Sequence, residues 1–329
     1  MFDTVRERAV GLGYAAGWNL VKTMPRGMSA RAFQSAADAA TVRNGKGARQ
    51  LRKNLRRVVG PGMSELRMDA LVGDALRSYS RYWLETFRLE GMDHGKISAS
   101  LDNHSRGGEH IDAGLARGNG VVVALPHSGN WDASGVWLVA QHGPFTTVAE
   151  RLRPQPLFDR FVAYRESLGM EVVALTGGDR PPTQVLTERL RQNRVVCLLA
   201  DRDLSRGGLE VDFFGEAAKM PPGPALLAAT TGADLLAVHC YFVGEHGWGH
   251  TISAPIDLGA GRLRDKVRLG TQRLADYFAA QIARYPADWH MLQRLWLADL
   301  PAADRRSADR RSDRRSANVP SAGSSSAGG

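Results

Sequence analysis

Cysteines, metal-binding patterns and nucleotide-binding motifs are scarce in this chain of 329 residues. Its two cysteines, Cys197 and Cys240, lie in apolar runs typical of buried strands, so neither predicts a disulfide or a metal site. The nine histidines lack metal-ligand spacing. No GxxxxGKS/T or GxGxxG motif follows a strand, which argues against nucleotide hydrolysis and dinucleotide redox chemistry. We expect no metal and no cofactor, and the low cysteine content fits a reducing cytoplasm.

Apolar runs long enough to cross a bilayer are also missing near the N-terminus. The uncharged stretch AVGLGYAAGWNLV, between Arg8 and Lys22, is shorter than the roughly 20 residues that a span needs. Its Tyr14 and Trp18 suit a headgroup boundary, so one interpretation is an interfacial helix with basic flanks. The alternative is a helix packed on the protein itself. Acidic residues near the start and the lack of a clear cleavage site argue against a secretory signal.

Acidic residues are few at the two ends of the chain. Residues 1–60 contain 12 Lys and Arg against three acidic residues, and residues 301–329 contain six Arg against three Asp. The total charge is +9, so residues 61–300 are net acidic. A basic N-terminal region favours an anionic membrane surface. Nucleic acid is not expected as a partner, because basic and stacking aromatic residues are not interleaved across the folded region.

Helical patterns fill the first hundred residues, and the texture changes at Gly120. Ser29 and Ser64 are candidate N-caps, and the segment GKGARQLRKNLRRVV between the two predicted helices is a basic amphipathic helix. That basic face could be solvated or could face lipid. Beyond Gly120, β-branched runs alternate with helical patterns, which predicts an α/β/α sandwich with a mixed central sheet and N-terminal basic helices. The predicted strands are 121–125, 145–150, 171–175, 195–200, 235–242 and 250–256, and the helices between and after them are 132–141, 155–168, 181–192, 221–231 and 263–284.

Three regions follow from this organisation. Residues 1–60 form a basic helical region that associates with membrane, and residues 61–300 form the α/β domain. Residues 301–329 repeat DRRS three times and end in SAGSSSAGG. This tail has almost no apolar residues to bury, so we expect it to be disordered.

The segment LPHSGNWD contains the strongest chemical signal. It follows a buried strand, and its His127 and Asp132 flank a turn that leads into a helix. A neutral imidazole can take the proton of an attacking alcohol, and a carboxylate on its other nitrogen fixes the tautomer. Asp132 could equally serve as a helix N-cap, a task that Asn130 could share. The position at the carboxyl end of a strand, where α/β sheets bind ligands, favours catalysis.

This segment resembles the His-x4-Asp block of the glycerolipid and lipid A late acyltransferases. Further blocks follow in the order of that family: AERLRPQPLFDRFVAYRESLG, LLADRDLSRGGLEVDFFGEAAKM and PADWHMLQRLW. The DRDLSRGG and PADWHMLQRLW segments and the basic N-terminal helices resemble most the branch that acylates phosphatidylinositol mannosides. The resemblance spans residues 20–300 and implies acyl transfer from a thioester to an alcohol.

The resemblance also implies roles for individual residues. His127 matches the general base and Asp132 its orienting carboxylate, whereas Glu150 and Arg165 match polar positions that line the acceptor pocket. Among Asp201, Arg202 and Asp203, which close the strand VVCLLA, one acidic member contacts the sugar or the catalytic histidine in the family. We favour Asp201, because His127, Glu150 and Asp201 all follow strands whose ends converge. Each acid could instead begin an ordinary loop. His290, between Trp289 and Met291, is expected to be a packed structural residue, as are Trp83, Trp137 and Trp296.

The expected activity is acyl-CoA-dependent O-acylation by a peripheral protein on the cytoplasmic face of the inner membrane. The resemblance implies palmitoyl-CoA as donor substrate. It implies the 6-hydroxyl of the mannose on inositol position 2 of a phosphatidylinositol mannoside as acceptor. One alternative is the same chemistry on another acceptor, such as a lysophospholipid or a lipid A precursor. The other is a nonenzymatic basic protein that binds membranes or nucleic acid through residues 1–60.

Overall fold

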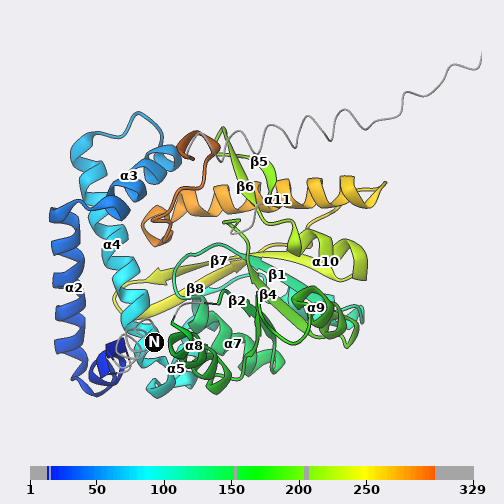
Figure 1. The fold of residues 1–329 in the computed structure, drawn as a ribbon, viewed down its shortest axis with the longest axis horizontal. Coiled ribbons are helices and arrows are strands. Elements are labelled where there is room, and N and C mark those ends of the chain that lie inside the picture. Colours follow the sequence, from blue (N-terminus) through cyan, green and yellow to red (C-terminus); the bar gives the residue numbers. More distant parts are fainter. Residues whose placement is uncertain (1–12, 15, 152–153, 204–206, 301–329) are drawn as a thin grey trace, which may run out of the picture.

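The computed structural model describes residues 13–14, 16–151, 154–203 and 207–300. The predicted tail, 301–329, and the start of the predicted membrane-associating region, residues 1–12, lie outside the described residues. Within the described part, an α/β domain carries a group of helices from the N-terminal third of the chain at one end (Figure 1). No helix in this described part is both long and apolar enough to cross a membrane.

A six-stranded mixed sheet forms the centre of the domain, in the order β3-β2-β4-β1-β7-β8. Five neighbouring strands are parallel, and β8 pairs antiparallel with β7 at one edge. The short β-branched runs form these strands because their side chains are covered on both faces. The strands are β1 (Val121–Leu125), β2 (Thr146–Ala149), β3 (Glu171–Ala174), β4 (Val195–Leu199), β7 (Asp234–Val243) and β8 (Gly247–Ile252).

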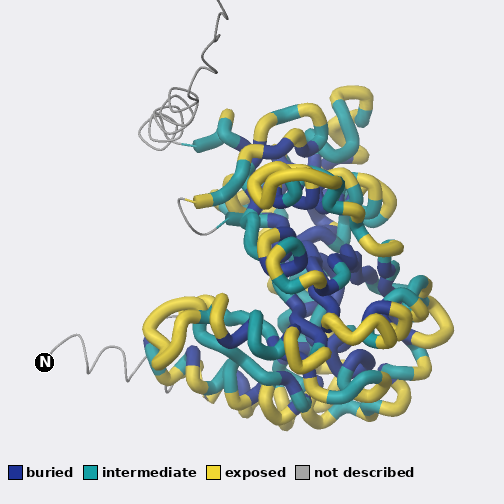
Figure 2. The backbone as a smooth tube through the Cα atoms, turned by 90° about the vertical axis from the view of Figure 1, so that its right-hand side faces the viewer, coloured by how far each residue is buried: buried dark blue, intermediate teal, exposed yellow. Residues whose placement is uncertain are grey.

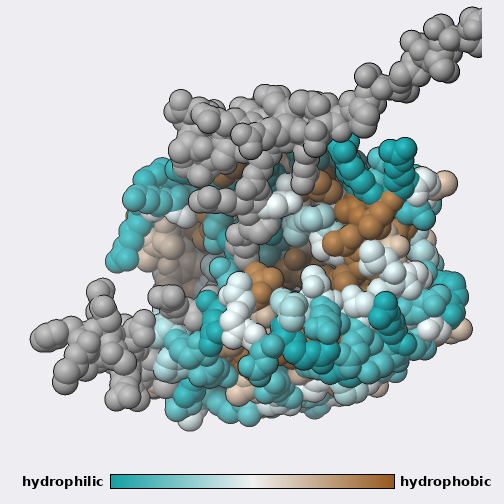
Figure 3. Space-filling model, turned by 45° about the vertical axis from the view of Figure 1, so that its right-hand side comes forward, coloured by the Kyte–Doolittle hydropathy of each residue, from teal (hydrophilic) through white to brown (hydrophobic). Residues whose placement is uncertain are grey.

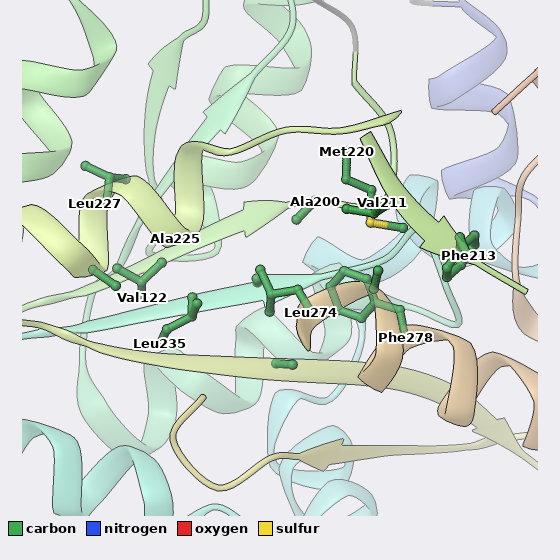
Figure 4. Packing of buried hydrophobic residues seen from close by; sticks show 14 of the residues in the cluster. Val122, Ala200, Val211, Phe213, Met220, Ala225, Leu227, Leu235, Leu274 and Phe278 are labelled. Atoms are coloured by element: carbon green, nitrogen blue, oxygen red, sulfur yellow. The ribbon is translucent and has the colours of Figure 1, made fainter. Parts of the chain in front are cut away.

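Helices cover both faces of the sheet, which confirms the predicted α/β/α sandwich. The core on one face includes residues of α9 (Pro182–Arg191), α10 (Gly223–Thr231) and α11 (Leu263–Arg284); Figure 4 shows part of it. The core on the other face includes residues of α5 (His94–His104), α6 (Glu109–Ala116), α7 (Trp131–His142) and α8 (Gln155–Ser167). Figure 2 shows these buried segments running through the middle of the molecule, with exposed segments outside.

The N-terminal helices are α2 (Arg26–Arg43), α3 (Lys46–Val59) and α4 (Glu65–Arg88). They enclose a third, smaller core that includes Leu51, Leu55 and Met68. Ser64 caps α4 as predicted, because its Oγ accepts from the backbone N–H of Arg67. Ser29 does not cap α2, since that helix begins three residues earlier, after Pro25, and Ser29 is buried within it.

The basic face of α3 is largely occupied by ion pairs within the protein. Arg52 and Arg56 contact Glu65, and Arg57 contacts Glu216 and Asp299. Arg49 and Lys53 remain exposed. The arginine cluster of α3 therefore ties the N-terminal helices to the rest of the fold, and only part of it faces solvent.

The uncharged N-terminal stretch presents two different sides. Residues 16–23 are helical, and the Trp18 ring is buried against Phe87, Phe161 and Tyr164, with ring centroids 4.9 to 5.5 Å apart. Tyr14 and Leu20 are exposed, at 54% and 59%. Trp18 therefore packs on the protein, as in the second interpretation of this stretch. Tyr14 and Leu20 form an apolar side that is exposed to solvent.

One pair of strands was not predicted. Residues 209–220 form a separate antiparallel hairpin, β5 (Leu209–Phe213) and β6 (Glu216–Met220). Phe214 and Gly215 make its turn with positive φ values of 57° and 78°. A hairpin turn of this kind usually contains Asn-Gly or Asp-Gly, and Phe-Gly gave no such signal.

Candidate active site

His127 lies just beyond the carboxyl end of β1, and its ring is held by Asp201. The Nδ1–H of His127 donates to Asp201 Oδ1 at 2.6 Å, and its backbone N–H donates to Asp201 Oδ2 at 3.0 Å. Asp201 follows β4, the parallel neighbour of β1, and Leu125 is in register with Leu199. Adjacent strands therefore bring the two residues together. The His127 side chain is 26% exposed, and none of the described residues is hydrogen-bonded to its Nε2.

Asp201 is completely buried and has several donors. Besides both contacts from His127, its Oδ2 accepts from the Trp289 indole N–H at 3.0 Å. Burial alone would raise the pKa of this carboxyl. The positive charge that the His127 ring can carry, together with the hydrogen bonds from His127 and Trp289, outweighs burial and lowers the pKa. Asp201 is thus an anion suited to fix the tautomer of the ring and to stabilise an imidazolium.

Asp132 has a different partner, which corrects the predicted His127–Asp132 pair. Its Oδ1 accepts from Arg165 Nε at 3.0 Å, and its Oδ2 lies 3.3 Å from the Tyr82 hydroxyl. Asp132 is only 2% exposed. The capping task falls to Asn130, whose side chain accepts from the N–H of Ala133. Asp132 is therefore neither the carboxylate that contacts the ring nor the N-cap, and instead links α7 to α4 and α8.

Arg165 is largely buried beside this carboxylate, with 15% of its side chain exposed. Burial would lower the pKa of the guanidinium, but the charge of Asp132 reverses the effect and the pKa is raised. Tyr82 also has a pKa well above its ordinary value, because of burial and the nearby Asp132 charge, so its hydroxyl stays protonated. The guanidinium of Arg165 therefore pairs with Asp132 inside the protein. The resemblance implied instead that Arg165 lines the acceptor pocket.

The remaining predicted residues lie at the same edge of the sheet without joining this pair. Glu150 follows β2 and is exposed, and its Oε2 lies 4.0 Å from Arg202 Nη2. Asp203 accepts from the backbone N–H of Gly208 at 2.8 Å, which closes the loop after β4. Glu150 and Arg202 therefore lie at the carboxyl ends of β2 and β4. His127 and Asp201 lie at the same edge of the sheet, where ligands bind in α/β folds.

Helix α4 and the segment after α11 make contacts with the site that were not predicted. Glu85 accepts from Asn130 Nδ2 and Trp248 Nε1, and so anchors the start of α7 to α4. His290 is 5% exposed, as expected of a packed residue, and burial lowers its pKa to about 3. Its backbone N–H donates to the carbonyl of His127 at 2.8 Å. No local sequence signal indicated these distant contacts.

An apolar cavity lies between α7 and the sheet. His127 lies beside it: Trp131 lines the cavity, and its ring centroid is 5.6 Å from that of His127. Both cysteines line it as well, and burial raises the thiol pKa of each, for Cys240 to about 12. The other lining residues include Val123, Leu125, Gly135, Leu138, Phe145, Met170, Leu199 and Val238.

This arrangement suits proton transfer from an alcohol. The imidazole is oriented by a buried carboxylate, presents its second nitrogen outward and adjoins an apolar chamber. Within the described residues, no group of three or more His, Cys, Asp or Glu side chains is placed to hold a metal. On the face shown in Figure 3, apolar residues reach the surface in a hollow bordered by polar ones.

Comparison with known families agrees with this geometry. The family model described as bacterial lipid A biosynthesis acyltransferase matches residues 4–298. The chain belongs to this acyltransferase family. Membership makes it an acyltransferase and argues against a nonenzymatic basic protein.

Two mycobacterial relatives are similar over most of their length, and a relative from Haemophilus influenzae over less than half. The phosphatidylinositol mannoside acyltransferase of Mycolicibacterium smegmatis is 56% identical over 289 residues, which cover 88% of this chain and 92% of the relative. The protein of the same name from Mycobacterium tuberculosis H37Rv is 53% identical over 298 residues, covering 91% and 92%. The lipid A biosynthesis acyltransferase of Haemophilus influenzae is 28% identical over 141 residues, covering 42% and 43%.

Proposed function

We propose that this acyltransferase moves a long acyl chain, palmitoyl, from acyl-CoA to a phosphatidylinositol mannoside. The acceptor atom is the 6-hydroxyl of the mannose on inositol position 2. The observation that carries the proposal is the His127–Asp201 pair beside the apolar cavity, with Nε2 directed away from the carboxylate. A base next to a chamber for an acyl chain is what transfer from a thioester to an alcohol requires.

His127 acts first as base and then as acid. Its Nε2 takes the proton of the mannose hydroxyl as that oxygen attacks the thioester carbonyl carbon, and Asp201 stabilises the resulting imidazolium. The tetrahedral intermediate collapses as the carbon–sulfur bond breaks. The imidazolium returns its proton to the departing thiolate, so the products are the acylated mannose and free coenzyme A. The substrate hydroxyl is the nucleophile, and no acyl-enzyme is formed.

The cavity under α7 holds the acyl chain in this proposal. Burial of each methylene contributes about 0.8 kcal/mol, so a long chain supplies much of the affinity for the donor. The Asp132–Arg165 pair lines the same cavity and also ties α7 to α8. We infer that this pair keeps two walls of the chamber at a fixed distance.

The acceptor assignment is supported by the two mycobacterial relatives, whose names specify phosphatidylinositol mannosides. Glu150 and Arg202, near the mouth of the site, are the polar residues that we assign to the sugar headgroup. A panel assay with radiolabelled palmitoyl-CoA tests this assignment against lysophospholipid and lipid A-type acceptors. We expect label in the phosphatidylinositol mannoside product. Label in only one of the other acceptors would refute the assignment.

We place the enzyme peripherally on the cytoplasmic face of the inner membrane. Tyr14, Leu20 and Met28 are exposed apolar residues in the N-terminal helices, beside the basic Arg26 and Arg31. Apolar side chains flanked by cations are what interfacial helices use on anionic lipid. Trp18 is excluded from this face because it packs on Phe87.

A sedimentation assay with anionic vesicles tests the membrane surface. The triple variant Tyr14→Ser, Leu20→Ser, Met28→Ser should lose most of its vesicle binding and keep its fold. The matched control is Val42→Ser with Leu66→Ser, which changes two exposed apolar residues elsewhere on the N-terminal helices. Equal binding by the triple variant and the wild type would refute this surface.

A further inference from the structure

The segment after α11 contacts the His127–Asp201 pair and the loop that follows His127 at three points. The backbone N–H of Gly129 donates to the Asp288 carbonyl at 2.9 Å, and that of His290 donates to the His127 carbonyl at 2.8 Å. Ser128 and Trp289 thus form an antiparallel bridge. The third contact is the Trp289 indole N–H on Asp201 Oδ2, at 3.0 Å. Trp289 therefore pairs with the loop that follows His127 and also donates to Asp201, the carboxylate that holds the His127 ring.

We propose that Trp289 is a positioning residue for acyl transfer, acting through the indole N–H that it donates to Asp201. Asp201 has two carboxylate oxygens, and each has a separate task. Oδ1 accepts from the His127 ring, whereas Oδ2 is held by the His127 backbone N–H and by Trp289. Fixing Oδ2 from both sides sets the rotation of the carboxylate, and so sets the direction in which Oδ1 holds the imidazole.

Burial makes this contact significant. Trp289 and Asp201 are both 0% exposed, so water cannot replace the donor without rearrangement of the core. A hydrogen bond to a buried charge is among the stronger ones in a protein. The Trp289 ring also packs against the rings of Phe213 and Trp296.

The two buried histidines nearest the pair do not change charge in the pH range of the test. Burial lowers the pKa of His290 and that of His239 to about 3 each, so both rings are neutral near pH 6. Burial raises the pKa of Asp288, but its carboxylate accepts from Ser78 and from the backbone N–H of Phe242 and contacts neither member of the pair. The acid limb of the pH profile therefore reports the His127–Asp201 pair.

The test compares Trp289→Phe with Trp296→Phe. Both tryptophans are 0% exposed and lie in the same C-terminal segment, but the Trp296 N–H donates to the backbone carbonyl of Phe213. Each substitution keeps an aromatic ring and removes one buried donor. For Trp289→Phe we expect kcat to fall about tenfold while KM for palmitoyl-CoA stays within about twofold. Loss of the positive end of the N–H dipole raises the proton affinity of the pair, so the acid limb of kcat/KM should move up by about half a pH unit or more.

Trp296→Phe should leave kcat and the acid limb unchanged, even if its melting temperature falls. Circular dichroism of each variant across the same pH range shows where it is folded, and only that range is used to locate the limb, so acid unfolding is not read as a shift. A Trp289→Phe profile that superposes on the wild type overturns the proposal, as does an equal shift in Trp296→Phe. The proposal rests on the proposed function, in which His127 is the base, and His127→Ala separates the failure of one from the failure of the other. Activity in His127→Ala refutes the proposed function. An inactive His127→Ala together with an unshifted Trp289→Phe profile refutes only the role of Trp289.

Discussion

Asp201 Oδ1 lies 2.6 Å from the Nδ1 atom of His127, although 74 positions separate the two residues in the chain. Asp132, the carboxylate that is nearer to His127 in the sequence, contacts Arg165 and Tyr82 instead. In the proposed mechanism the two acids have separable tasks, because Asp201 orients the base whereas Asp132 holds helices together. The first two predictions distinguish them.

Asp201→Asn should abolish most of the activity and leave the fold intact. The amide keeps the shape of the side chain but removes the charge that stabilises the imidazolium, and it can hold the ring in the wrong tautomer. We expect kcat to fall by about 10⁴-fold, as for carboxylates that orient a catalytic histidine elsewhere. Steady-state kinetics with a melting curve measures both quantities. Activity within about tenfold of the wild type would contradict the assignment of Asp201.

Asp132→Asn should act mainly on stability. It leaves the largely buried Arg165 cation in the chamber wall without its anion, and loss of one member of a buried pair costs up to about 3–5 kcal/mol. The double variant Asp132→Asn, Arg165→Gln should recover part of that loss, because no charge is left unpaired. Chemical denaturation of the single and the double variant measures the free energy of unfolding of each. A stable Asp132→Asn with a shifted pH profile would show that Asp132 acts on the base after all.

Gly135 and Leu138 should control the length of the acyl chain. Both line the cavity, and a Cβ at Gly135 would lie 2.5 Å from the Met170 Cε and 3.2 Å from the Phe145 Cζ. Gly135→Leu should therefore reduce the preference for palmitoyl-CoA over lauroyl-CoA by roughly tenfold or more, since each excluded methylene costs about 0.8 kcal/mol.

The opposite change enlarges the chamber. Leu138→Ala should shift the preference toward stearoyl-CoA, and Gly27→Leu, at a position with open space around it, serves as the control. Competition assays with mixed acyl-CoA donors give the ratios directly. Unchanged ratios in both cavity variants would mean that the acyl chain binds elsewhere.

Three buried histidines should make the protein sensitive to mild acid. Burial lowers the pKa of His239 and His290 to about 3 and that of His250 to about 4, whereas an unfolded histidine titrates near 6.5. Between these values the unfolded state binds protons that the folded state does not. Stability therefore falls as the pH drops below about 6.5, by up to about 1.4 kcal/mol per pH unit for each ring.

His239→Phe tests this directly. Within the described residues neither ring nitrogen of His239 has a hydrogen-bond partner, so the substitution removes two unsatisfied buried atoms. We expect a higher melting temperature and a smaller loss of unfolding free energy between pH 6.5 and 4.5. The exposed His246→Asn serves as control, because its side chain is 93% exposed. A pH dependence unchanged by His239→Phe would contradict the account.

The sequence predicted the sheet well because its strands are short β-branched runs separated by helical patterns. It also placed His127 and Asp201 at one edge, since both follow strands. It misassigned Asp132 because spacing along the chain cannot show that α7 begins at Trp131 and directs that carboxylate to α4 and α8. Trp289 carried no local signal, as its contact with Asp201 spans 88 positions. The turn of the β5–β6 hairpin lacked the residues that normally mark one.

The most direct test of the account is acyl transfer by His127→Ala, measured with radiolabelled palmitoyl-CoA and a phosphatidylinositol mannoside acceptor. Its thermal transition, recorded on the same sample, verifies that the chain is folded. We expect transfer at background level from a variant that still unfolds in one cooperative transition, because the ring is partly exposed and contributes little to the core. Substantial transfer by the folded variant would contradict the central claim that His127 is the base.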